Sequence, residues 1–172
     1  AKELYVMLYT ITGQEQYKEK QDSVGMGNTP GNLANNGMVL TDGDTVYIAN
    51  KPAIGSITKK TKDRETEILK GTGSINQVKD LNIKGDTLYF RIDYMGLPGY
   101  ISSSEKTVGL YSIKTDGSDE TLIKTSTADL YYGDLMVWGN SLYYIRRVLS
   151  NTKPIYLCRS DLNGANENII VE

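Results

Sequence analysis

Short runs of apolar and aromatic residues recur along the chain, and each is introduced by a glycine turn. Three such segments align on their glycine, at residues 43–48, 85–90 and 139–144. In each one, Gly-Asp or Gly-Asn is followed by a hydroxyl residue, an apolar residue and a tyrosine. A turn pair that leads into an aromatic-rich run predicts a β-hairpin, with a short apolar strand entering the turn.

A second hairpin is predicted after each of these strands. In the second copy it turns through Asp116 and Gly117, and in the third copy through Asn163 and Gly164. The first copy is weaker, with its turn at residues 62–63. Each unit therefore reads as four short antiparallel strands joined by tight turns.

The spacing of the units favours a repeat. Gly43 and Gly85 lie 42 positions apart, whereas Gly85 and Gly139 lie 54 apart. The twelve additional residues of the second interval lie between Ile92 and Val108, where glycine, proline and serine indicate a long surface loop. A period of about 42 residues with four strands per unit is typical of a β-propeller blade.

Both faces of the strand after each glycine carry apolar side chains. Val46, Leu88 and Leu142 occupy one face, and the tyrosine that follows each of them occupies the other. A sheet that is apolar on both sides must be covered on both sides, whereas a two-sheet sandwich has one polar face. We therefore predict an all-β fold of β-propeller blades, with a sandwich and a β-solenoid as the alternatives.

The predicted blades span residues 36–70, 74–124 and 127–170, and residues 1–30 form an incomplete N-terminal blade hairpin and its connection. These make about three and a half four-stranded blades, whereas closed propellers have about four to eight. The chain is therefore expected either to be a partial ring within a longer polypeptide or to complete its ring as a homodimer.

The strands at residues 88–93 and 142–146 read Leu-Tyr-Phe-Arg-Ile-Asp and Leu-Tyr-Tyr-Ile-Arg, and Asp-Gly-Ser follows at residues 116–118. This pattern resembles the YWTD propellers of the lipoprotein-receptor group, and more closely the bacterial surface proteins of uncharacterised function that carry a related repeat. Only the tyrosine of the motif is kept in all three copies. The resemblance covers roughly residues 28–170. It implies a six-bladed, non-catalytic binding module that is extracellular or at the cell surface, its secretion signal not being present in this chain.

Composition argues against several functional classes. The chain has no histidine, and its 19 Lys and Arg are interspersed with 21 Asp and Glu, which argues against nucleic-acid binding. Cys158 is the only cysteine, so an intrachain disulfide and a Cys/His zinc site are excluded. The apolar runs are shorter than the roughly 18 residues of a membrane span, so no membrane insertion is expected.

Acidic and amide side chains gather at the predicted turns. Asp42, Asp44, Asp116 and Asp119 allow a calcium-site interpretation, as do the oxygen side chains around Gly164. Asp-Gly and Asn-Gly pairs are also what tight hairpin turns require, and calcium needs six to eight converging oxygens. We therefore predict turns, no metal site and no cofactor.

Candidate ligand-binding residues are the aromatic side chains of Tyr94 and Tyr100 on the insertion, and of Trp138 beside a turn glycine. The alternative is that all three pack against their own blades. No catalytic residue is assigned. The leading hypothesis is a non-enzymatic module that recognises a protein or glycan through its blade loops. The alternatives are a fragment of a glycoside-acting enzyme with a carboxylate pair such as Asp93 and Glu105, and a purely structural spacer.

Overall fold

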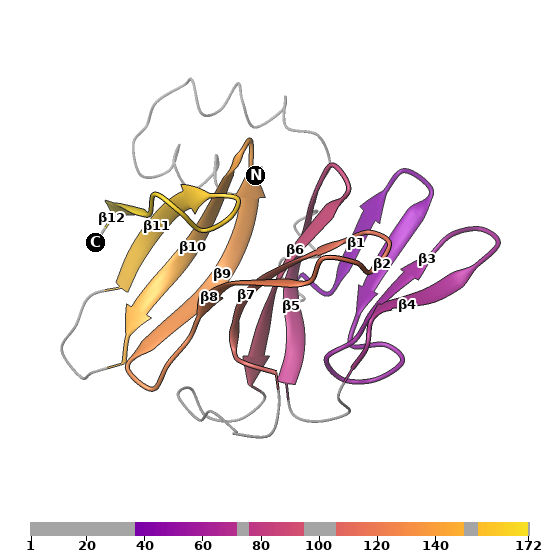
Figure 1. The fold of residues 1–172 in the computed structure, drawn as a ribbon, viewed down its shortest axis with the longest axis horizontal. Coiled ribbons are helices and arrows are strands. Elements are labelled where there is room, and N and C mark those ends of the chain that lie inside the picture. Colours follow the sequence, from indigo (N-terminus) through magenta and orange to yellow (C-terminus); the bar gives the residue numbers. More distant parts are fainter. Residues whose placement is uncertain (1–36, 72–75, 95–105, 150–154, 172) are drawn as a thin grey trace.

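The computed structural model describes residues 37–71, 76–94, 106–149 and 155–171. Within these ranges the protein is all-β, with three four-stranded antiparallel sheets and no helix (Figure 1). The described residues accordingly contain no helix of the length and apolarity that crossing a membrane requires. The incomplete hairpin predicted at residues 1–30, and most of the insertion after Ile92, lie outside the described residues.

The strands follow the chain from sheet to sheet. The first sheet contains β1 (Val39–Asp42), β2 (Thr45–Ala49), β3 (Ile57–Lys60) and β4 (Glu65–Leu69). The middle sheet contains β5 (Asn76–Lys84), β6 (Thr87–Tyr94), β7 (Gly109–Lys114) and β8 (Thr121–Thr125). The last sheet contains β9 (Leu130–Trp138), β10 (Ser141–Val148), β11 (Ile155–Asp161) and β12 (Asn168–Val171). In each sheet the spatial order of the strands is their order in the sequence.

The predicted glycine turns join the first two strands of every sheet. Gly43, Gly85 and Gly139 all have a positive φ, between 55° and 60°. The first strands of the middle and last sheets are nine residues long, longer than the short apolar runs predicted there. A β-bulge at Asp80 in β5, and another at Asp134 in β9, interrupts the alternation of side chains. Because the alternation breaks at the bulge, a search for residues that alternate with a period of two finds only part of each strand.

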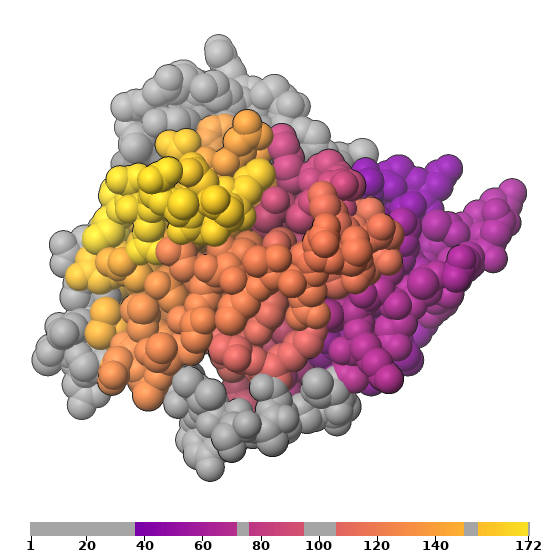
Figure 2. All heavy atoms as spheres, viewed as in Figure 1, coloured from indigo at the N-terminus to yellow at the C-terminus, as the bar shows by residue number. Residues whose placement is uncertain are grey.

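Two hydrophobic cores lie on opposite faces of the middle sheet. On one face, Leu88 and Phe90 pack with Tyr47 of the first sheet. On the other face, Tyr89 packs with Tyr144 of the last sheet. Leu88 and Tyr89 are neighbours in β6, and both are buried, so the prediction that this strand is apolar on both faces is confirmed. The space-filling view in Figure 2 shows the middle sheet, which runs from pink to orange-red, lying against the first sheet, which runs from indigo to purple.

Candidate functional site

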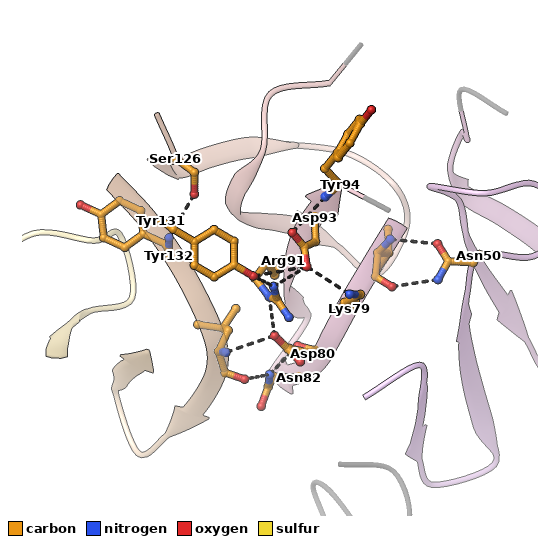
Figure 3. Close-up of polar contacts among 12 residues, drawn as sticks. Asn50, Lys79, Asp80, Asn82, Arg91, Asp93, Tyr94, Ser126, Tyr131 and Tyr132 are labelled. Carbon is orange, nitrogen blue, oxygen red and sulfur yellow. Dashed lines mark hydrogen bonds and ion pairs between the residues drawn. The ribbon is translucent and has the colours of Figure 1, made fainter. Parts of the chain in front are cut away.

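A cluster of charged side chains lies where the middle sheet meets the last sheet (Figure 3). Asp80 and Lys79 come from β5, Arg91 and Asp93 from β6, and Tyr131 from β9. Arg91 and Asp93 follow Tyr89 at alternate positions, so they face the last sheet as Tyr89 does. The face of β6 that carries Tyr89 therefore also carries two charged side chains.

Arg91 is the centre of this cluster, and only 5% of its side chain is exposed. Its Nε donates to Asp80 Oδ2 at 2.7 Å, and its Nη1 donates to Asp93 Oδ2 at 2.7 Å. Nη1 also donates to the Tyr131 hydroxyl. Lys79 Nζ is a second donor to Asp93 Oδ2, at 3.0 Å. One guanidinium thus joins two carboxylates and a tyrosine from three strands.

The bulge in β5 turns polar side chains towards the last sheet. Asp80 has a φ of 55°, and its Oδ2 accepts from the backbone N of Leu135 at 3.2 Å. Two positions later, Asn82 donates from Nδ2 to the Leu135 carbonyl and accepts at Oδ1 from the Val137 N, both at 3.1 Å. The Asn82 amide therefore bonds the β9 backbone much as a neighbouring strand would. These bonds fix the two sheets to each other.

Burial and charge act in opposite directions on these groups. Burial raises the pKa of Asp80, and the charge and hydrogen bond of Arg91 offset only part of that rise. Burial alone would lower the pKa of Arg91, but the attraction of Asp80, Tyr131 and Asp93 outweighs it, so the pKa lies above its ordinary value. Arg91 has several acidic neighbours, whereas the Asp80 carboxylate shares one guanidinium with Asp93 and otherwise accepts only from the Leu135 backbone N. Burial also raises the pKa of Tyr131 to about 12.

The members of this cluster bind one another, which limits what the cluster can do chemically. Asp93, one of the two carboxylates of the glycosidase hypothesis, is bonded by Arg91 and Lys79 and accepts from Tyr131 at 3.3 Å. Its partner in that hypothesis, Glu105, lies outside the described residues. The arrangement connects two sheets, with three donors on Asp93 Oδ2 and the Tyr94 backbone N on Oδ1.

A second polar cluster joins β8 to the last sheet. Glu167 accepts from the Tyr144 hydroxyl at 2.7 Å, from Lys124 Nζ at 3.0 Å and from Arg146 Nη1. Burial acts to raise the pKa of Glu167, but the hydrogen bonds from Tyr144 and Lys124 and the nearby positive charges outweigh it and lower the pKa. Glu167 therefore stays ionised at neutral pH, and its negative charge pairs with Lys124 of the middle sheet and Arg146 of the last sheet.

Of the three residues predicted to bind a ligand, the two that the structure describes, Tyr94 and Trp138, are not brought together. Tyr94 ends β6, is half-buried and points away from the Arg91 cluster (Figure 3), while its backbone N donates to Asp93 Oδ1 at 2.9 Å. Trp138 ends β9, where its ring centroid lies 5.9 Å from that of Tyr143. Tyr94 pairs with Asn76, the first residue of β5. Trp138 follows Val137, which bonds to Asn82 near the last residues of β5. The two aromatic residues therefore lie at opposite ends of β5. Tyr100 lies outside the described residues.

Among the turn residues considered as calcium ligands, Asp116 and Asn163 bond within their own turns. Asp116 Oδ1 accepts from the N and Oγ of Ser118, at 2.9 and 2.7 Å, and Asn163 Oδ1 accepts from Ala165 N at 3.0 Å. In the part of the chain that the structure describes, no group of three or more acidic, histidine or cysteine side chains is placed to hold a metal ion. These bonds support the turn interpretation.

Sequence reasoning did not find the Arg91 cluster. The available signal was the alternation of Tyr89, Arg91 and Asp93, which places two charges on a face expected to be covered. Comparison of the chain with protein-family models and with curated proteins finds no match. The function is therefore inferred from the geometry of the described residues.

Proposed function

We propose that the three sheets are consecutive blades of a β-propeller, and that the chain is a non-enzymatic binding module of an extracellular or cell-envelope protein. The observation that carries this proposal is the middle sheet, which has a hydrophobic core on each face. In a β-propeller, each blade is a sheet whose two faces are covered by the neighbouring blades. The resemblance to the YWTD propellers supports the same proposal.

The polar clusters support a role in binding over a role in catalysis. The charged groups around Arg91 and Glu167 are occupied in joining sheets. A rigid stack of sheets leaves recognition to the loops at its ends, where binding residues of such scaffolds are commonly found. Tyr94 stands at the start of the insertion and is the described residue best placed to take part. The ligand is proposed to be a protein or a glycan.

The test is a ligand screen on the purified chain, using a glycan array and a panel of extracellular proteins. Replacing Tyr94 and Tyr100 together by Ala should abolish binding of a ligand that the insertion recognises, because aromatic rings contribute much of the contact energy at such surfaces. The matched control replaces both by Phe, which keeps the rings and should keep the binding. Unchanged affinity in the double Ala variant would show that the insertion is not part of the binding site.

The glycosidase alternative has its own outcome in the same preparation. A panel of chromogenic glycosides is expected to show no hydrolysis by the wild-type chain. Turnover that disappears in Asp93→Asn would overturn the non-enzymatic proposal. The absence of both turnover and ligand would instead favour the structural spacer.

A further inference from the structure

A groove of about 330 Å³ lies between the β3–β4 hairpin of the first sheet and the turn that joins β7 to β8 in the middle sheet. Its walls therefore come from two different sheets. Two cations, one carboxylate and three threonines line it, together with Ile68. These polar residues are Lys59, Arg64, Asp116, Thr61, Thr66 and Thr115.

The two cations of the groove differ from those of the clusters described above. Lys59 is half-buried, and its Nζ donates to the Thr115 carbonyl at 3.2 Å and lies 5.9 Å from the centroid of the Tyr47 ring. Arg64 is exposed. Among the described residues, neither cation forms an ion pair, whereas Arg91 and Arg146 are both paired with carboxylates. Neither positive charge of the groove is therefore held at salt-bridge distance by a carboxylate of the described residues.

The carboxylate of the groove reduces this charge without cancelling it. The hydrogen bonds that Asp116 accepts from Ser118 lower the pKa of Asp116, so it is ionised at neutral pH. Lys59 and Arg64 against Asp116 leave one net positive charge in the lining. One bound carboxylate would neutralise this net charge, whereas a doubly charged phosphate would leave the groove with a net negative charge. Arginine binds carboxylates through two parallel hydrogen bonds, and lysine adds a point charge.

The three threonines extend the set of polar groups along the groove. The Thr61 hydroxyl already donates to the Arg64 carbonyl and accepts from the Arg64 N, both at 3.2 Å, so it can only accept a further bond from a ligand. A threonine hydroxyl without such bonds can both donate to and accept from a sugar hydroxyl. Thr61 and Thr66 come from the first sheet and its hairpin, and Thr115 comes from the β7–β8 turn. A ligand with one carboxylate and several hydroxyls would therefore bond to both walls.

We propose that this groove binds an acidic saccharide, with a uronate carboxylate between Lys59 and Arg64 and its hydroxyls on the threonines. The inference rests on the proposed binding function. It specifies a glycan as the ligand and a site separate from Tyr94 and Trp138.

The experiment titrates the full chain by calorimetry with oligogalacturonate, with a neutral glucose oligomer of the same length and with inorganic phosphate. Oligogalacturonate is expected to bind, and Arg64→Gln should weaken it by about tenfold or more, the effect of losing one charge-assisted contact. The matched control is Lys60→Gln, which removes the same charge from the next residue of β3, on the opposite face of the strand. Its affinity should stay at the wild-type value.

Lys59→Gln is a second variant, read together with its thermal unfolding because Lys59 also bonds to the Thr115 carbonyl. A folded Lys59→Gln protein should bind oligogalacturonate as weakly as Arg64→Gln does. The proposal is overturned if oligogalacturonate does not bind, if phosphate or the neutral oligomer binds as tightly, or if Lys60→Gln weakens binding equally. If oligogalacturonate does not bind, while a ligand found in the screen is lost in the Tyr94 and Tyr100 variant, the groove proposal is overturned and the proposed binding function stands.

Discussion

Arg91 shows how a buried charge is held in this protein. Its guanidinium is removed from water, and its donors are directed at Asp80, Asp93 and Tyr131. The desolvation cost of a buried ion pair is large, so the pair adds little net stability over apolar residues of the same shape. Removing only one partner is different, because the remaining charges stay buried without compensation.

We predict that Arg91→Met lowers the free energy of unfolding by about 3–5 kcal/mol, because Asp80 and Asp93 lose their shared partner inside the joint. Urea denaturation of both proteins at neutral pH measures the difference. Lys114→Met is the control, since Lys114 pairs with Asp86 on the exposed surface at 2.8 Å. That variant should unfold almost as the wild type does. Equal effects of the two substitutions would show that the Arg91 cluster is not a buried joint.

At the scale of elements, the outer turn of each later sheet packs on the sheet before it. A Cβ added to Gly117, in the β7–β8 turn, would lie 2.8 Å from the Ile68 carbonyl oxygen of β4. A Cβ added to Gly164, in the β11–β12 turn, would lie 2.6 Å from Ile123 Cγ2 of β8. These glycines therefore provide both the positive φ of a turn and the close approach of two sheets.

This close approach gives a prediction with a matched control. Gly85→Ala should cost about 1–2 kcal/mol, because Gly85 has a φ of 60° and a Cβ there meets nothing within 4 Å. Gly117→Ala should cost at least about 1 kcal/mol more, because its Cβ must also displace backbone. Chemical denaturation of the two variants measures the difference. If they lose equal stability, the β7–β8 turn does not pack closely on the first sheet.

At the scale of the whole molecule, the two end sheets differ from the middle one. Val39 is 45% exposed, and its cross-strand partner Ile48 places it on the face of the first sheet away from Tyr47. In the last sheet, Tyr143 and Ile145 are half-buried on the face away from Tyr144. If the sheets are propeller blades, these are the faces that the next blades cover. Two copies of the chain would bring six such sheets together.

The homodimer form of the propeller proposal predicts a molar mass of twice 19.1 kDa by light scattering. Val39→Lys should shift the chain to the monomer, because a buried lysine without a partner opposes docking of a second copy. Leu122→Lys is the control, since Leu122 is 40% exposed on the outer strand of the middle sheet. It should leave the dimer intact. A wild-type monomer at high concentration would exclude completion of the ring by a second copy.

The sequence by itself determined where the hairpins turn. Gly43, Gly85 and Gly139 mark hairpins because a positive φ is a local property of the chain. The adjacent Leu88 and Tyr89 predicted a strand buried on both faces, because alternation along a strand is also local.

Only the tertiary structure decided which of these residues meet. Asp80 reaches Arg91 and Leu135 because a bulge turns it out of the alternation, and its partners come from other strands. Gly117 approaches Ile68 across two sheets, and Tyr94 and Trp138 lie at opposite ends of the strands although both are aromatic strand ends. Local pattern specifies conformation and burial, whereas contact between distant positions depends on how the sheets pack.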